Sequence, residues 1–126
     1  MITKEITLCG KQVTLAYCYA TEISYKILSD EDITDFIAEA ATAIQDKNRM
    51  PDIRKSIFLV LASMQSYYES KDEQAPVTDK QLMYDSTSEE LGTALGVIIG
   101  LRANFYHIPK GEPEDKQKEG SEEKNV

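Results

Sequence analysis

The chain has 126 residues, 41% of them hydrophobic and 29% charged, and its formal net charge at pH 7 is -8. This length is typical of one domain with a buried core. The acidic balance argues against binding to nucleic acid or to an anionic membrane, because such partners are met by clustered Lys and Arg. Residues 47–55 hold the densest basic group, but Asp46 and Asp52 accompany it, so we interpret it as a solvated loop.

Two absences guide the expected location. The longest apolar run, near Val97–Leu101, is far shorter than the ~20 residues of a membrane-spanning helix. Residues 1–12 lack the apolar core of a signal peptide. We therefore expect a cytoplasmic protein without a membrane segment.

Apolar and polar side chains alternate within the first seventeen residues in two short runs, which is typical of two β-strands. With Gly10 first in a two-residue type II′ turn, Leu8 would lie opposite Val13 and Ile6 opposite Leu15. The apolar side chains then share one face. Because two strands are marginally stable alone, we expect this hairpin to pack against helices.

The same register separates the two cysteines, Cys9 and Cys18, by several residues along the strands. This exceeds the Cα spacing of up to ~7 Å that a disulfide allows, so we predict free thiols. The single histidine, His107, lies at the other end of the chain. A Cys–His nucleophile is therefore not expected.

Offsets of three and four between apolar residues predict helices in the rest of the chain. The predicted segments are about 21–28, 30–47, 51–70, 78–84 and 88–106. Ser29 followed by acidic residues 30–32 indicates an N-cap and negative charge at the positive end of the second helix. The third helix is the most apolar of the early ones, so we expect it to lie centrally. Capping boxes are predicted for Thr78 with Gln81, and for either Ser86 with Glu89 or Thr87 with Glu90.

The last predicted helix has two unlike sides when its residues are placed at 100° intervals. The bulky side is formed by Leu91, Leu95, Ile98, Leu101 and Phe105, and the small side by Gly92, Gly96, Gly100 and Ala103. Three glycines in one helix each cost roughly 1 kcal/mol relative to alanine, which suggests a compensating close contact. That contact is either internal packing or a surface for a partner or a second copy. On the second interpretation the four small residues are the partner-binding site. Arg102 lies in the bulky arc and must reach out to solvent or pair with an acid.

Beyond residue 108 the composition changes to charged and polar residues with a single aliphatic one, Val126. Such a segment buries too little surface to offset its conformational entropy. We predict a helical domain with an N-terminal hairpin over residues 1–108 and a disordered charged tail over 109–126. The expected fold class is mainly α, a small helical bundle with a minor α+β element.

No catalytic constellation is recognisable in the chain. One histidine cannot form a multi-histidine metal site, and the sequence has no CxxC pair, no phosphate-binding GxxxxGK[ST] loop and no GxGxxG pattern. We therefore expect no enzyme activity, no cofactor and no metal.

The opening ITKEITLCGKQVTLAYCYATEISYKIL and the closing SEELGTALGVIIGLRANFYHIP, with a charged tail after them, frame a helical body. In this order of segments, and in its pattern G-K-x-V-x-L, the chain resembles tail assembly chaperones of long-tailed bacteriophages and prophages. The resemblance spans roughly residues 1–109 and carries no individual site residue.

This resemblance implies a non-enzymatic assembly factor of a bacterial host cell. Such a protein binds the long helical tape-measure protein and assists polymerisation of tail-tube subunits around it, and in some phages a longer form arises by translational frameshifting. The small side of the last helix would also allow this chain to form a homo-oligomer. Two other classes stay open: a small structural tail or connector subunit, and a regulatory protein-binding module of a mobile element.

Overall fold

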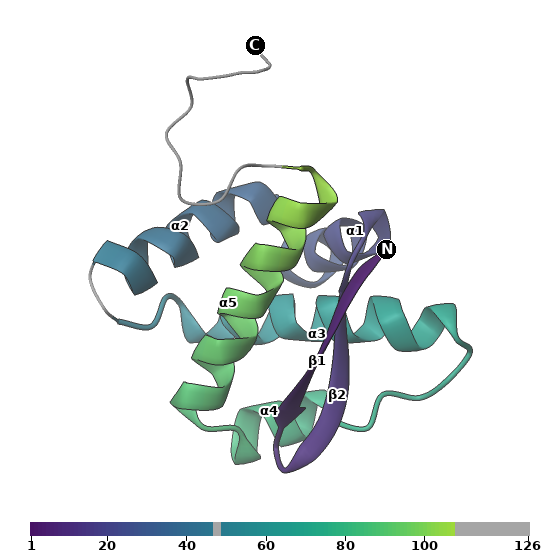
Figure 1. The fold of residues 1–126 in the computed structure, drawn as a ribbon. Helices are drawn as coiled ribbons and strands as arrows, with labels where there is room; N and C mark the ends of the chain where they lie inside the picture. Colours follow the sequence, from purple (N-terminus) through teal and green to yellow (C-terminus); the bar gives the residue numbers. More distant parts are fainter. Residues whose placement is uncertain (47–48, 108–126) are drawn as a thin grey trace.

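The computed structural model describes residues 1–46 and 49–107. In these residues a β-hairpin precedes five helices, which confirms the predicted mainly α fold with an N-terminal hairpin (Figure 1). The elements are β1 (Ile2–Leu8), β2 (Lys11–Tyr17), α1 (Tyr19–Ser29), α2 (Ile33–Asp46), α3 (Ile53–Ser70), α4 (Asp79–Asp85) and α5 (Ser88–Phe105). The tail predicted for 109–126 lies outside the described residues.

The hairpin forms with a register that differs from the prediction. Leu8 pairs with Lys11 and Ile6 with Val13, so the turn consists of Cys9 and Gly10 instead of beginning at Gly10. Both turn residues have positive φ, 53° and 76°, as a type I′ turn requires. The register is shifted by two residues, and since side chains alternate with period two, the apolar face stays the same.

The free edge of β2 is closed by side chains of α3. The Ser63 hydroxyl accepts from the Ala16 N–H at 3.0 Å and donates to the Ala16 carbonyl at 2.8 Å. The Tyr68 hydroxyl accepts from the Thr14 N–H at 3.0 Å. These bonds satisfy backbone groups that an edge strand otherwise leaves unpaired. The buried Thr21 hydroxyl also donates to the Ala16 carbonyl, which joins α1 to the same edge.

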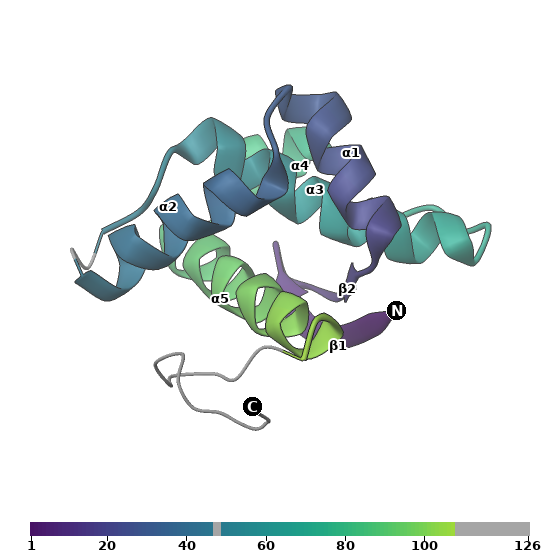
Figure 2. The same cartoon turned by 90° about the horizontal axis from the view of Figure 1, so that it is seen from above.

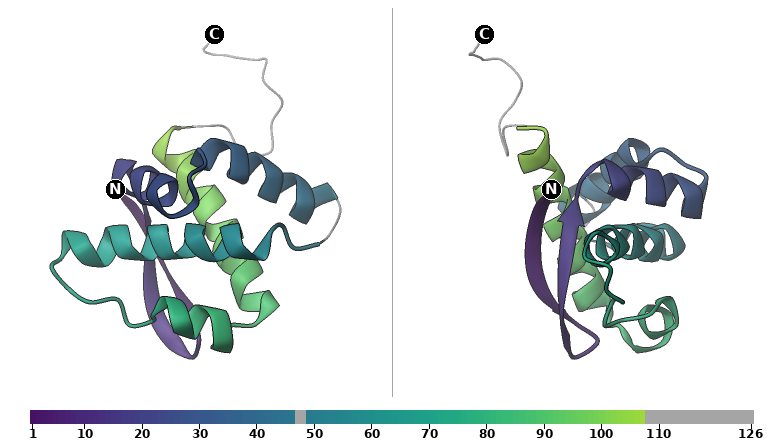
Figure 3. Two further views of the ribbon diagram at one scale, coloured as in Figure 1. Left: turned by 180° about the vertical axis from the view of Figure 1, so that it is seen from behind. Right: turned by 90° about the vertical axis from the view of Figure 1, so that its right-hand side faces the viewer.

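Helix α3 is central, as its apolar sequence predicts, and it contacts β2, α1, α4 and α5. Figure 3 shows the hairpin and α5 on one side of α3. In Figure 2, α1 and α2 lie at the periphery of the molecule. The largest fully buried side chains come from the hairpin and from all five helices. They include Tyr17, Tyr25, Phe36, Leu59, Met64, Leu82 and Ile98.

The prediction that Ser29 caps the second helix is wrong. Ser29 is the last residue of α1, and its hydroxyl donates to the Tyr25 carbonyl at 2.8 Å. Asp30 follows with φ of 60° and closes α1 with a bond from its N–H to the Lys26 carbonyl. Ser29 is equally suited to either helix end in the sequence. The left-handed turn at Asp30 assigns it to α1, and α2 begins three residues later.

Three further helix starts were predicted, and the structure confirms two of them. Pro51 precedes α3 instead of occupying its first position, and Asp52 is the N-cap, accepting from the Lys55 N–H at 3.0 Å. The capping box of Thr78 is confirmed for α4. For α5, the structure selects Thr87 with Glu90 from the two predicted alternatives.

Candidate functional site

The bulky and small sides of α5 lie in different surroundings. Leu91, Leu95, Ile98 and Leu101 are buried, and Phe105 is half-buried, so the predicted core side is confirmed. On the small side, Gly96 is exposed, whereas Gly92, Gly100 and Ala103 are half-buried. The four residues share one helix face, which we call the small face.

The small face is not tightly packed against another element at Gly92 or at Gly96. A Cβ built on Gly96 would meet no atom within 4 Å, and one on Gly92 would meet only the Met50 sulfur at 3.7 Å, an ordinary van der Waals distance. The internal close contact is therefore absent at Gly96, the centre of the small face.

Two shallow hollows, each about 430 Å³, lie along the small face and meet at Thr93. The first is lined by Ile44, Arg49, Met50, Ser88, Glu89, Gly92 and Thr93. The second is lined by Lys4, Thr93, Gly96, Val97, Gly100, Leu101 and Asn104. We call the two hollows together the groove; Arg49 lines the first hollow and Lys4 lines the second. Neither Lys4 nor Arg49 forms an ion pair with any of the described residues.

Arg102 lies in the bulky arc of α5, and it forms no ion pair with an acidic side chain among the described residues. Its guanidinium lies over the Tyr106 ring, 5.4 Å from the centroid, and its Nη2 donates to the Thr34 hydroxyl at 3.5 Å. Its Nε is buried and has no hydrogen-bond acceptor in the part of the chain that the structure describes. The expected reach towards solvent is therefore only partial, since the residue is half-buried.

A carboxylate joins the ends of α1 and α5. Glu22 Oε2 accepts from the Tyr17 hydroxyl at 2.7 Å and from the Tyr106 hydroxyl at 2.5 Å. Burial raises the pKa of Tyr17, and the bond to Glu22 raises that pKa further. The bond to Glu22 is the main cause that raises the pKa of Tyr106 to about 12. Both tyrosines are therefore neutral donors at ordinary pH, and the three residues form a structural clamp.

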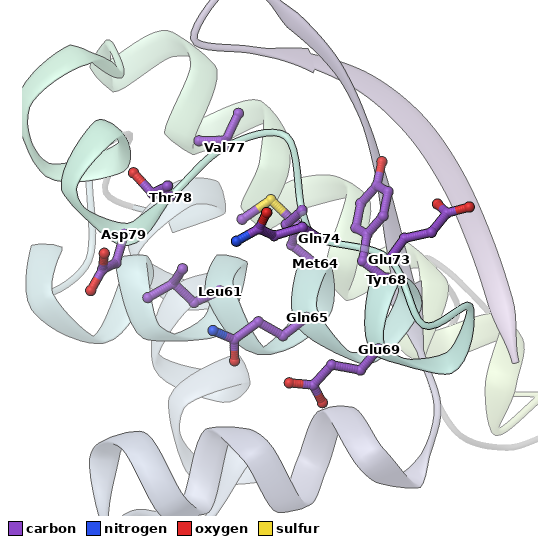
Figure 4. Close-up of a pocket in the computed structure, with 11 residues that line it drawn as sticks. Leu61, Met64, Gln65, Tyr68, Glu69, Glu73, Gln74, Val77, Thr78 and Asp79 are labelled. Atoms are coloured by element: carbon purple, nitrogen blue, oxygen red, sulfur yellow. The ribbon is translucent and has the colours of Figure 1, made fainter.

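A pocket that no sequence pattern predicts lies between α3 and the segment leading to α4 (Figure 4). It measures about 360 Å³, and its apolar lining includes the buried Leu61, Met64 and Val77. Glu69, Glu73 and Asp79 also line it, and none forms an ion pair within residues 1–46 and 49–107. The pocket suits an apolar group that carries or adjoins a positive charge. Part of its wall is the loop between α3 and α4. Loops have no periodic pattern of apolar residues, so the sequence could not predict this pocket.

The cysteines are free thiols, as predicted. Burial raises the pKa of Cys9, whose sulfur donates to the Gln81 carbonyl at 3.6 Å, so its thiolate is disfavoured. Within the described ranges no three His, Cys, Asp or Glu side chains gather as metal ligands.

None of the helices in residues 1–46 and 49–107 combines the length and apolar character that crossing a membrane requires. No protein-family model matches the chain, and no curated protein or solved structure shows significant similarity to it.

Proposed function

We propose that the chain is a non-enzymatic tail assembly chaperone of a bacteriophage or prophage. It acts in the cytoplasm of the bacterial host, where it binds a helix of the tape-measure protein and assists assembly of tail-tube subunits. The proposal rests on the order of segments that resembles this family. The observation that carries it is the open small face of α5, centred on Gly96.

The physical argument concerns how closely a helix can approach α5. Glycine has no side chain, so a partner's apolar side chains can descend to the α5 backbone in the hollow beside Gly96 and Gly100. Val97 and Leu101 supply apolar contact in the same hollow. This is the helix-in-groove mode of recognition, in which an amphipathic helix lays its apolar stripe into a groove.

The charges around the groove specify the partner further. The chain carries a net charge of -8, yet Lys4 and Arg49 line the two hollows beside a single acid, Glu89. A partner helix with acidic residues beside its apolar stripe would complement these cations. We therefore propose a tape-measure segment of this composition as the bound helix.

The test is co-expression with a fragment of the tape-measure protein encoded beside this gene. The wild-type chain should keep the fragment in the supernatant, and Gly96→Leu should weaken that effect because it fills the hollow. Gly96→Ala, which leaves the groove nearly open, should retain the fragment. Ala38→Leu is the control, since it places the same leucine side chain at an exposed helical position on α2.

The outcome also separates the alternatives. A chaperone is absent from purified particles, whereas a tail or connector subunit is present in them. If no tail genes neighbour this one and no long helical protein is retained, the chaperone proposal is wrong. A regulatory protein-binding role then becomes the better explanation.

A further inference from the structure

The outer edge of β1 carries backbone groups that point away from β2. In the register of the hairpin, Thr3 lies opposite Ala16 and Glu5 lies opposite Thr14. The backbone groups of Ala16 and Thr14 point away from β1, because they bond to side chains of α3. Opposite residues of an antiparallel pair direct their backbone groups either towards each other or both away. The N–H and C=O groups of Thr3 and Glu5 therefore point outwards, and by the same alternation so do those of Thr7.

We call the backbone N–H and C=O groups of Thr3, Glu5 and Thr7 the β1 edge. The three residues are exposed, and none of these groups bonds to a residue that the structure describes. In the right-hand view of Figure 3, β2 lies between β1 and α3, so the helix that closes the edge of β2 does not reach the β1 edge. A row of unpaired groups on an exposed strand is a template for one more strand. The β1 edge itself therefore specifies an extended backbone as its partner.

The second hollow lies beside the β1 edge. Lys4 is paired with the buried Leu15, so its side chain is on the face of the hairpin that packs on the core. From there it lines the hollow together with Gly96 and Gly100 of α5. A strand added to β1 would run about 4.8 Å away from it and would direct alternate side chains to this same face. These side chains would enter the hollow, where the two glycines place no side chain of their own.

We infer that the β1 edge binds an extended segment of another protein, which pairs with β1 as a third strand and directs an acidic side chain towards Lys4. Among the described residues that line the second hollow, Lys4 alone is charged, and it forms no ion pair within the described chain. Opposite charges on directly opposed strand residues attract. On either side of Lys4 the inward residues of β1 are the half-buried Ile2 and Ile6, which suit apolar neighbours. The inward residues of the bound segment therefore read apolar, acidic, apolar.

The charges of β1 disfavour a second copy of this chain as the occupant. Two β1 strands that pair antiparallel through their outer edges place one residue opposite its own copy. With this axis at Lys4 two cations meet, and with the axis at Glu5 two carboxylates meet. With the axis at Thr3 or at Ile6, one of these like-charged pairs remains as diagonal neighbours. The inward face of β1 also carries no acidic residue that could lie opposite Lys4.

This inference does not rest on the proposed function. A helix laid along the small face and a strand paired with β1 both use the second hollow, so they exclude each other there. Only the strand needs the backbone groups of the β1 edge. This difference allows each binding mode to be tested without the other.

The probe is the heptapeptide acetyl-Thr-Val-Thr-Glu-Thr-Val-Thr-amide, whose inward residues are Val, Glu and Val. Titration of the isotope-labelled full chain, followed by the NMR signals of its backbone amides, measures binding. The amides of Thr3, Glu5 and Thr7 should shift most. We expect a dissociation constant of about 0.1 to 3 mM, because the contact is much smaller than a standard interface. The same peptide with Lys in place of Glu should bind about five-fold more weakly or worse.

Methylation of peptide nitrogens distinguishes strand pairing from non-specific adhesion. Methyl groups on the third and fifth nitrogens remove the donors that face β1, so this peptide should not bind. Methyl groups on the second and sixth nitrogens face away from β1, so this peptide should bind nearly as well as the unmodified one. The two peptides carry the same number of methyl groups and the same side chains, so each controls for the other.

Two variants of the chain give independent readouts. Glu5→Pro removes an outward N–H but no bond to β2, and proline is tolerated at such a position of an edge strand. It should abolish peptide binding while circular dichroism shows an intact fold. Lys4→Glu should invert the charge preference, so that the peptide with Lys binds more tightly than the peptide with Glu. Glu5→Pro should still retain the tape-measure fragment, because a helix in the groove uses no backbone group of β1.

Three results would overturn the inference. The first is the absence of shifts at Thr3, Glu5 and Thr7 at peptide concentrations up to about 5 mM. The second is equal binding of the two methylated peptides. The third is protection of these three amides that grows with the concentration of the chain alone, which would assign the β1 edge to a second copy. Peptide binding by a chain that does not retain the tape-measure fragment would support this inference and contradict only the proposed function.

Discussion

Replacing Gly96 by alanine should stabilise the protein, although three glycines in a helix suggest close packing. The structure leaves more than 4 Å around a Cβ at this position, so the added methyl group meets no obstacle. Alanine is favoured over glycine in a helix interior by roughly 0.8 to 1 kcal/mol. No opposing steric cost exists in the described fold, so the whole of this gain should appear in the free energy of unfolding.

Gly10→Ala is the matched control for this prediction. A Cβ at Gly10 also meets nothing within 4 Å, but the residue has φ of 76°. An alanine in this left-handed region costs roughly 1 to 2 kcal/mol. The two substitutions make the same chemical change in equally open surroundings, so only the backbone conformation should decide that one stabilises and the other destabilises.

Thermal unfolding followed by circular dichroism measures both effects. A gain of about 1 kcal/mol corresponds to a rise in Tm of roughly 4 to 8 °C for a domain of about this size, and Gly10→Ala should lower Tm by a similar amount. A loss of stability in Gly96→Ala at low protein concentration would refute the reasoning. It would mean that the small face is covered within the monomer.

Other predictions concern the buried hydroxyls and the clamp. Ser63→Ala should lower the free energy of unfolding by about 1 to 3 kcal/mol in urea titrations, because it leaves the Ala16 N–H buried without a partner; an unchanged midpoint would contradict this. Tyr106 donates to Glu22 only while neutral, and its pKa is raised from about 10 to about 12. Its contribution to stability is therefore complete below pH 10 and is lost as the pH rises through about 12. Tyr106→Phe should flatten the difference in Tm between pH 9 and pH 11, and a pH profile identical to that of the wild type would argue against the clamp.

Local signals in the sequence were enough for the element order and for the buried side of α5. The spacing of Leu91, Leu95, Ile98 and Leu101 is a periodic pattern, and the capping box at Thr78 is complete within four residues. Such features depend only on residues that are close in the sequence, so they are also present in the folded protein. The free cysteines were also predicted correctly, although the register used to argue for them was shifted by two residues.

Contacts between segments far apart in the sequence decided the features that no local pattern predicts. Ser29 suits two helix ends, and the turn at Asp30 selects one. The hydroxyls of Ser63 and Tyr68 have no periodic signature, yet they close the β2 edge from α3.

The sequence by itself does not show that one face of α1 and the small face of α5 are exposed. A helical pattern shows which residues share a side, but exposure depends on which other elements cover that side. Ile23 of α1 and Ile98 of α5 are both isoleucines in helices, and one is 60% exposed while the other is fully buried. The sequence by itself therefore determined the helices and the hairpin, whereas the packing of segments far apart in the chain determined which of their faces remain available for binding.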